Sequence, residues 1–231
     1  MAPRRPGVAA AIVDACHRLA GAGFVAATDG NVSARLPGGN ILTTRTGINK
    51  GMVTAKDLIE VSPDGTRVRG ASQPSTELPL HLFIYRERTD VAAVVHAHPP
   101  YATAFATARL PLDDNLFPEV IIGLGRIPLA PYATPSTSEV ADSIAPFVHS
   151  SDAILLSNHG AVTYGANPLE AFFKMQKMEH SALIACIARL LGGGKQLTSD
   201  EVGRLRAAWA LAQSRGGVKR LPKVHRAAID R

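Results

Sequence analysis

Residues 91–100 read VAAVVHAHPP, and this stretch decides the class of fold that the sequence predicts. Five small or β-branched apolar residues lead into His96 and His98, and two prolines end the run. Such a run is typical of a buried strand whose last residues turn polar where the sheet opens to a site. Side chains two positions apart leave a strand on the same face. His96 and His98 are therefore expected to project together, about 7 Å apart along the strand.

A second apolar run also ends in a histidine. Residues 153–160 read AILLSNHG, so His159 stands directly before a glycine. A third imidazole from a neighbouring strand end would complete a set of three ligands with a fourth position open, which is a common way to hold catalytic zinc. The alternative is three unrelated histidines, one packed in the core and two at strand ends. The joint occurrence of H-x-H and N-H-G favours the metal site.

The composition predicts a globular protein with one large core. The chain has 231 residues, of which 46% are hydrophobic and 5% aromatic. No apolar stretch reaches membrane-spanning length, and no apolar signal segment precedes the first helical pattern. Cys16 and Cys186 lie far apart in helix-like contexts, which argues against a disulfide framework. We therefore expect a cytoplasmic protein with reduced cysteines and no membrane contact.

The net charge of +6 is concentrated toward the C-terminus. A basic tail can contact nucleic acid, but no aromatic residues alternate with these charges as a stacking platform would require. We therefore expect no nucleic-acid partner. A positive overall field suits an anionic substrate such as a sugar phosphate.

The hydrophobic pattern predicts helices and strands in a mixed order. Helices are expected over residues 7–20, 75–88, 99–108, 138–148, 167–191 and 200–213. Strands are expected over residues 31–36, 41–44, 58–62, 66–69, 91–98, 120–124, 129–130 and 153–157. Hairpin-linked strands followed by strands alternating with helices predict one α/β domain over residues 1–231, with a mixed sheet and helices on both faces. Its core is expected over about residues 7–213, followed by a basic tail over 214–231.

Glu77 stands at the predicted start of a helix, directly after Ser75 and Thr76. A carboxylate at this position complements the helix dipole, and it is also where a base beside a metal-bound substrate could stand. Loop amides and hydroxyls suitable for an anion cradle occur in three segments, GNVS at 30–33, TTRTG at 43–47 and ST at 75–76. None of them matches the GxxxxGK[ST] or GxGxxG nucleotide loops.

Taken in order, these segments resemble the class II aldolase and adducin family. The resemblance rests on GNVSARL, TTRTGI, PSTELPLHLFIY, VVHAHPPYATA, APYATPSTSE and LLSNHGAVTYG, and it covers roughly residues 7–200. It implies a three-layer α/β/α fold with a central mixed, largely antiparallel sheet. It also implies a homotetramer with active sites at subunit interfaces and a role in carbohydrate metabolism.

The resemblance also implies roles for individual residues. His96, His98 and His159 are the implied zinc ligands, one ion per subunit, with Mn²⁺ or Co²⁺ as alternatives because imidazole suits several of these ions. Glu77 is the implied catalytic acid and base. The implied phosphate-binding residues are Asn31, Thr46, Gly47, Ser75 and Thr76.

The chain departs from the aldolases of this family where they bind the aldehyde part of the substrate. Those enzymes have a tyrosine before the APYAT segment and another near the C-terminus. Here residues 115–119 read NLFPE, and no tyrosine follows Tyr164. Glu119 is the candidate catalytic replacement, with a surface glutamate at a strand edge as the alternative. Arg45 stands where the family often has proline, and it either contacts phosphate or points to solvent.

The resulting prediction is a zinc-dependent aldolase. It would cleave a ketose 1-phosphate, of the fuculose 1-phosphate or 5-deoxypentulose phosphate type, into dihydroxyacetone phosphate and an aldehyde through a metal-stabilised enediolate. Alternatives on the same fold are a pentulose-5-phosphate 4-epimerase and a sugar-acid phosphate decarboxylase. A non-catalytic module like the adducin head domains would be expected to lack the metal ligands. A zinc hydrolase would not need the phosphate cradle.

Overall fold

The computed structural model describes residues 7–112 and 115–214. Its strands are β1 (Asn31–Arg35), β2 (Ile41–Thr44), β3 (Leu58–Val61), β4 (Arg67–Arg69), β5 (Ala93–Ala97), β6 (Leu129–Ala130), β7 (Ala153–Leu156) and β8 (Gly160–Gly165). Its α-helices are α1 (Val8–Gly21), α2 (Leu78–Glu87), α3 (Pro100–Thr107), α4 (Pro118–Gly123), α5 (Glu139–Ile144), α6 (Pro168–Leu190) and α7 (Ser199–Ser214). Two short 3₁₀ helices are η1 (Lys50–Met52) and η2 (Ala55–Asp57).

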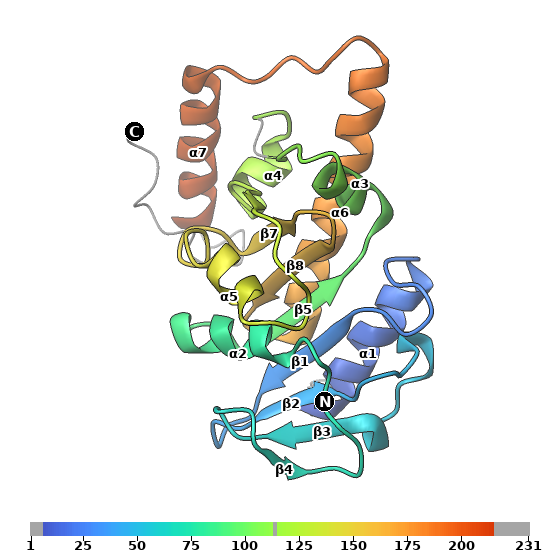
Figure 1. Cartoon of the computed structure of the whole chain (residues 1–231). Coiled ribbons are helices and arrows are strands. Elements are labelled where there is room, and N and C mark those ends of the chain that lie inside the picture. The colour runs from blue at the N-terminus through green and yellow to red at the C-terminus, as the bar shows by residue number, and fades with distance from the viewer. Residues whose placement is uncertain (1–6, 113–114, 215–231) are drawn as a thin grey trace.

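The strands form one eight-stranded sheet in the order β4-β3-β2-β1-β5-β8-β7-β6 (Figure 1). Neighbouring strands are antiparallel except β6 and β7, which are parallel. The predicted mixed, largely antiparallel sheet is therefore confirmed. The basic tail predicted over 214–231 lies outside the described residues, apart from Ser214.

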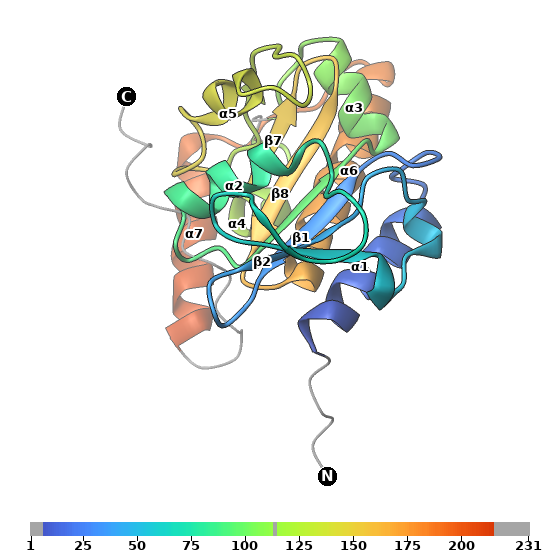
Figure 2. The ribbon, with the colours of Figure 1, turned by 60° about the horizontal axis from the view of Figure 1, so that its bottom comes forward.

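Helices cover both faces of the sheet, as Figure 2 shows. Alternate residues of β5 supply the two interfaces. Ala93, Val95 and Ala97 belong to the apolar cluster with residues of α1, α3 and α6. Val94 belongs to the cluster on the opposite face, with residues of α2 and α5. Because side chains alternate along a strand, His96 lies on the same face as Val94, which is the face covered by α2.

Residues 120–124 are not the strand that the pattern predicts. They lie largely within helix α4, which packs against α6 and α7. Pro118 is at the first position of α4, where its missing N–H costs little. Val120 and Ile121 are buried. A run of five apolar residues is too short to distinguish a buried strand from a buried helix, and here tertiary packing selects the helix.

Residues 160–165 form β8, although the pattern predicts no strand there. The segment is bounded by Gly160 and Gly165 and is buried along its whole length. It pairs with β5 on one side and β7 on the other, so two long-range ladders stabilise it. Helix α5 is shorter than the predicted 138–148, since Pro146 lacks the N–H that would continue it. The cap of α6 is confirmed, because the Asn167 side chain accepts a hydrogen bond from the amide of Glu170.

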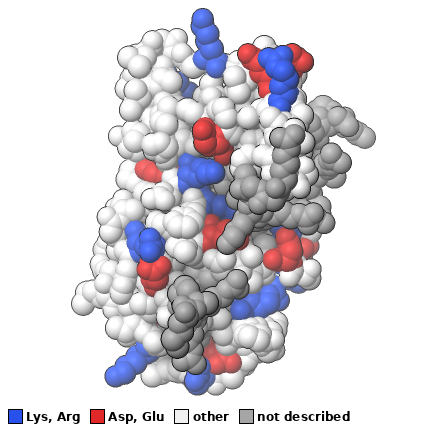
Figure 3. All heavy atoms as spheres, turned by 180° about the vertical axis from the view of Figure 1, so that it is seen from behind, with Lys and Arg blue, Asp and Glu red and all other residues white. Residues whose placement is uncertain are grey.

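Acidic and basic side chains are interspersed on the face of the molecule seen in Figure 3. Among the described helices, none is both long and apolar enough to cross a bilayer.

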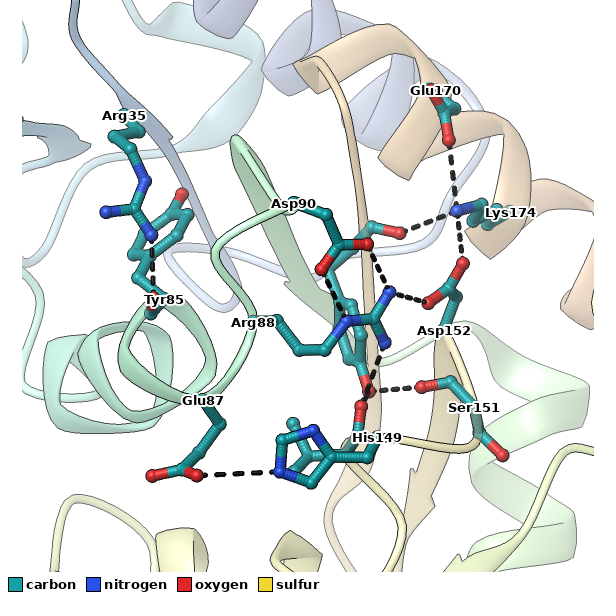
Figure 4. Close-up of polar contacts among 12 residues, drawn as sticks. Arg35, Tyr85, Glu87, Arg88, Asp90, His149, Ser151, Asp152, Glu170 and Lys174 are labelled. Carbon is teal, nitrogen blue, oxygen red and sulfur yellow. Dashed lines mark hydrogen bonds and ion pairs between the residues drawn. The ribbon is translucent and has the colours of Figure 1, made fainter. Parts of the chain in front are cut away.

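A largely buried ionic network lies near the start of β5, at the opposite end of the strand from His96. Figure 4 shows its residues. The Arg88 guanidinium is 2.7 Å from Asp90 Oδ1 and 3.0 Å from Asp152 Oδ1. Lys174 Nζ is 2.8 Å from Asp152 Oδ2 and 3.0 Å from Glu170 Oε1. Asp152 therefore joins two buried cations from different elements. It ties the segment before β7 to the end of α2 and to α6.

We expect Asp152→Asn to lower the free energy of unfolding by about 1.5–3 kcal/mol, because Arg88 and Lys174 lose the buried anion that they share but keep Asp90 and Glu170. Urea denaturation followed by circular dichroism measures this change. Asp14→Asn is the matched control, since Asp14 forms an exposed pair with Arg18. Such pairs contribute at most about 1 kcal/mol. Equal losses in the two variants would show that the buried network carries no special share of the stability.

Candidate functional site

Three histidines converge at the end of β5. His96 lies in β5, His98 is the first residue after β5, and His159 lies in the turn between β7 and β8. One ligand nitrogen from each ring lies within 4.8 Å of the others. The convergence follows from the pairing of β5 with β8, in which Ala97 is opposite Ala161. That register brings the turn containing His159 beside the end of β5.

Local backbone geometry explains the residues around His159. Asn158 has a φ of 56°, in the left-handed region that asparagine tolerates better than most residues. Gly160 has no room for a side chain, because a Cβ there would lie 2.5 Å from His98 Cδ2 and 2.6 Å from the carbonyl oxygen of Ala97. The N-H-G sequence thus forms a turn that presents one imidazole and lets another ring approach its backbone.

The spacing of the His96 and His98 rings suits a tetrahedral metal ion. Nε2 of His96 and Nε2 of His98 are 3.1 Å apart. Two ligand nitrogens of a tetrahedral zinc ion would be about 3.3 Å apart. Nδ1 of His96 lies 3.0 Å from the carbonyl oxygen of Ala161, which leaves Nε2 free for an ion. This outer hydrogen bond is the type that orients metal-bound histidines.

Asp29 lies on the outer side of His98, at a distance longer than a hydrogen bond, and no motif in the sequence marks it. Its Oδ2 is 3.6 Å from His98 Nδ1. The only sequence signal is the position of Asp29 directly before Gly30 and Asn31. Gly30 has a φ of 71°, and a Cβ there would lie 2.8 Å from the carbonyl oxygen of His96. The loop before β1 therefore passes directly over the histidine strand, which brings Asp29 to the site.

Glu77 is the N-cap of α2, and its carboxylate touches the histidines. Oε1 is 3.0 Å from His159 Nε2, and Oε2 is 3.2 Å from His96 Nε2. Burial alone would raise the pKa of this carboxyl, but His96 and His159 outweigh burial and hold the pKa well below its usual range. Glu77 thus stands both at the helix start and beside the histidine cluster, so its two interpretations are compatible.

Asn31 connects β1 to this carboxylate. It is directly opposite His96 in the β1–β5 register, so the two side chains lie on the same face of the sheet. Asn31 Nδ2 donates to Glu77 Oε2 at 2.8 Å. Asn31 Oδ1 is buried and has no hydrogen-bond partner among the described residues. That acceptor is available to a bound hydroxyl group.

The other predicted phosphate-binding residues lie on two adjoining segments. The amide of Thr46 donates to the carbonyl oxygen of Gln73 at 3.0 Å, and the amide of Ser75 donates to that of Thr44 at 3.2 Å. These bonds hold the loop after β2 against the segment that precedes α2. Thr46, Gly47 and Thr76 are exposed. The structure thus brings Thr46 and Gly47 together with Ser75 and Thr76, and phosphate binding by them stays a prediction.

Arg45 pairs with Asp57 instead of pointing freely to solvent, and its contact with phosphate stays a prediction. Its Nε is 2.9 Å from Asp57 Oδ1. The hydrogen bond from Arg45 is the largest cause of the lowered pKa of Asp57, which falls to about 2. Arg45 is therefore engaged in a structural ion pair at the edge of the cradle segments.

Glu119 lies in the first turn of α4 and not at a strand edge. It lines an open cavity of about 710 Å³ with neighbours that include Phe117, Lys177 and His180. None of the three clustered histidines lines this cavity. The structure therefore separates Glu119 from the histidine cluster within the described chain, and its catalytic role stays a prediction.

A buried chain of hydrogen bonds joins β1 to α2, the helix that begins after Glu77. Ser33 Oγ lies 2.7 Å from His81 Nδ1 and 2.8 Å from the hydroxyl of Tyr85. Burial lowers the pKa of His81 to about 3, so its ring is neutral near pH 7. Because His81 and Tyr85 are in α2 and Ser33 is in β1, the chain holds α2, and with it Glu77, against the sheet. These contacts give His81 a structural role.

Comparison with known proteins gives concordant results. The family described as Class II Aldolase and Adducin N-terminal domain matches residues 10–186. A 3-oxo-tetronate 4-phosphate decarboxylase of Escherichia coli O6:H1 is 34% identical over 192 residues, covering 80% of this chain and 88% of the relative. An L-fuculose phosphate aldolase of Methanococcus maripaludis is 36% identical over 168 residues, covering 72% and 89%. A solved L-fuculose 1-phosphate aldolase structure superimposes with a TM-score of 0.81 at 28% identity, covering 88% of this chain and 96% of that chain.

We expect the purified protein to bind about one divalent ion per chain, as the three converging nitrogens indicate. His98→Ala removes one ligand, and its loss of Zn²⁺ affinity should exceed the roughly 10–100-fold that removal of an outer partner costs. Isothermal titration with Zn²⁺ measures both stoichiometry and affinity. His149→Ala is the control, because His149 is exposed and pairs with Glu87. Unchanged zinc affinity in His98→Ala would exclude the proposed ligand set.

Proposed function

Because the chain belongs to the class II aldolase and adducin family, we propose that it is a metal-dependent lyase acting on a phosphorylated ketose. Specifically, we propose an aldolase that cleaves a ketose 1-phosphate into dihydroxyacetone phosphate and an aldehyde. The observation that best supports this proposal is the position of Glu77, whose two carboxylate oxygens lie within 3.2 Å of His96 and His159. An ionised base therefore stands beside the place where a metal-bound carbonyl would react.

His96, His98 and His159 would hold the ion, with zinc as the first choice and Mn²⁺ or Co²⁺ as alternatives. A divalent ion held there would supply Lewis-acid polarisation of the substrate carbonyl and stabilise negative charge on its oxygen.

The chain's own residues account for the proton transfer. When the C3–C4 bond breaks, the C4 hydroxyl gives its proton to a base at the aldehyde end, for which Glu119 of another copy is the candidate. The O–H electrons form the aldehyde carbonyl, the aldehyde leaves, and the C3–C4 bonding electrons pass toward the C2 carbonyl to form an enediolate. The Glu77 carboxylate takes up a proton from solvent and passes it to C3, or removes a proton from C3 in the synthetic direction. The hydrogen bond from Asn31 keeps the Glu77 carboxylate oriented toward the histidines.

The cradle segments would bind the phosphate of the substrate. The proposed contacts are the hydroxyls of Thr46, Ser75 and Thr76, the amide of Gly47 and the side chain of Asn31, because the backbone amides of Thr46 and Ser75 already donate to carbonyl oxygens. A phosphate held away from the reacting carbons supplies binding energy that orients the substrate, so its loss should affect turnover as well as affinity.

Decarboxylation of a sugar-acid phosphate is the second candidate. In that reaction the bond to the carboxylate breaks, CO₂ leaves, and the electrons again form an enediolate that accepts one proton. It needs no base for an aldehyde hydroxyl, which suits the separation of Glu119 from the histidines. The similarity to the 3-oxo-tetronate 4-phosphate decarboxylase also supports it.

A homotetrameric, cytoplasmic enzyme remains part of the proposal. Active sites at subunit interfaces would allow Glu119 of one copy to act in the site of another. Within a single described chain, Glu119 is separated from the histidines.

Incubation with a substrate panel tests the choice of reaction. Fuculose 1-phosphate, ribulose 1-phosphate, 5-deoxyribulose 1-phosphate, ribulose 5-phosphate and 3-oxo-tetronate 4-phosphate cover the alternatives. We expect dihydroxyacetone phosphate from at least one ketose 1-phosphate, detected by ¹H NMR. CO₂ release from the oxo acid alone would replace the aldolase proposal by the decarboxylase. An epimer without any three-carbon product would contradict both.

Glu77→Gln should reduce turnover by about 10²–10⁴-fold while zinc binding persists, because the amide cannot transfer the proton. Exchange of the C3 hydrogens of dihydroxyacetone phosphate with deuterated solvent measures this step without the aldehyde substrate. Glu87→Gln, at the other end of α2, is the matched control. Wild-type exchange in Glu77→Gln would remove Glu77 from the mechanism.

A further inference from the structure

Lys50 is a buried cation close to the proposed phosphate cradle. It begins η1 and is only 1% exposed. Its Nζ donates to the carbonyl oxygen of Thr28 at 2.8 Å and to that of Ile48 at 2.5 Å. Both acceptors are neutral, so these hydrogen bonds leave its positive charge unbalanced. Burying a charge without a partner is costly, and proteins seldom retain one without a use.

The two carbonyls belong to the two loops that carry the cradle. Thr28 lies three residues before Asn31, and Ile48 directly follows Gly47. The neighbouring Asn49 makes a similar connection, since its Nδ2 donates to the carbonyl oxygen of Ala27 at 2.7 Å. The ammonium group therefore lies where the loop before β1 meets the loop after β2.

The surroundings of Lys50 do not neutralise it by contact. Burial raises the pKa of the Cys16 thiol to about 12, so this neighbour is uncharged. Burial lowers the pKa of Lys50, and the through-space attraction of Asp29 and Glu77 offsets only part of that effect. Arg45, the other nearby cation, has its own partner in Asp57. The position beside the cradle thus holds one cation that lacks a contacting anion.

We infer that Lys50 is the buried counter-charge of the substrate phosphate, a positioning residue that balances the bound dianion through the cradle loops without touching it. The inference rests on the proposed function, because it needs a phosphate between these loops. It gives Lys50 two tasks. Its hydrogen bonds brace the two loops, and its charge favours phosphorylated substrates over their unphosphorylated analogues.

Reciprocal coupling makes the electrostatic task measurable. If protonation of Lys50 raises phosphate affinity by some factor, bound phosphate must lower the acid dissociation constant of Lys50 by the same factor. A tenfold effect on affinity therefore corresponds to a rise of about one unit in the pKa of Lys50. A residue that only braced the loops would show no such coupling.

The first test compares variants with inorganic phosphate as the probe. Lys50→Met removes the charge and the hydrogen bonds, whereas Lys50→Gln removes the charge and keeps a donor. Lys56→Met is the matched control, because Lys56 in η2 is exposed and its loss changes the net charge equally. We expect phosphate binding, measured by calorimetry, to weaken about tenfold or more in both Lys50 variants and to stay within about twofold in Lys56→Met. Wild-type affinity in Lys50→Gln would overturn the inference.

The second test uses the unmodified protein, so it does not depend on the folding of a variant. The ¹³Cε signal of labelled Lys50 is titrated with and without saturating phosphate, and the amide signals of Asn31, Thr46 and Gly47 report where phosphate binds. We expect the amides to shift and the pKa of Lys50 to rise by about one unit. If the amides shift and Lys50 does not respond, the inference is wrong and the proposed cradle stands. If phosphate leaves these amides unchanged, the cradle and the inference fail together.

Discussion

The antiparallel register of β5 against β8 is the constraint on which the site depends. With His96 opposite Val162 and Ala97 opposite Ala161, the end of β5 lies beside the turn that carries His159. A slip of one residue would turn His96 to the other face of the sheet, toward α1 and α6, and away from Glu77. The burial of Val94 on one face and of Val95 on the other makes such a slip costly, so core packing also sets the geometry of the ligands.

The two buried polar centres of the sheet differ in how their charges are satisfied. Around Asp152, every strong charge has a contacting partner of opposite sign, and the network ties elements together. Around Glu77, Asn31 Oδ1 has no partner among the described residues, the imidazole nitrogens face one another, and Lys50 is held only by neutral carbonyls. Unsatisfied groups of this kind mark functional sites, because a ligand completes them.

The proposed aldolase and decarboxylase activities share most of their chemistry. Both break a carbon–carbon bond beside a carbonyl and both need one proton returned to carbon, which Glu77 can provide. They differ in the group that leaves, and therefore in the residues around that group. The proposal assigns Glu119 on α4 to that region in another copy, because in the described chain Glu119 lines a cavity that none of the three histidines lines. Under both proposals the metal and phosphate sites would stay the same, and the residues around the leaving group would decide the reaction.

The sequence by itself determined the three strand-end histidines, the start of α6 and the layered fold class, because these follow from local periodicity, capping and breaker residues. It did not determine the helix at Pro118–Gly123 or the strand β8, because short apolar segments take their form from the elements that pack on them. It also did not identify Asp29, Lys50 or the Arg45–Asp57 pair. Their importance arises from loops brought together by pairing of distant strands, and only the tertiary structure decides which charges meet there.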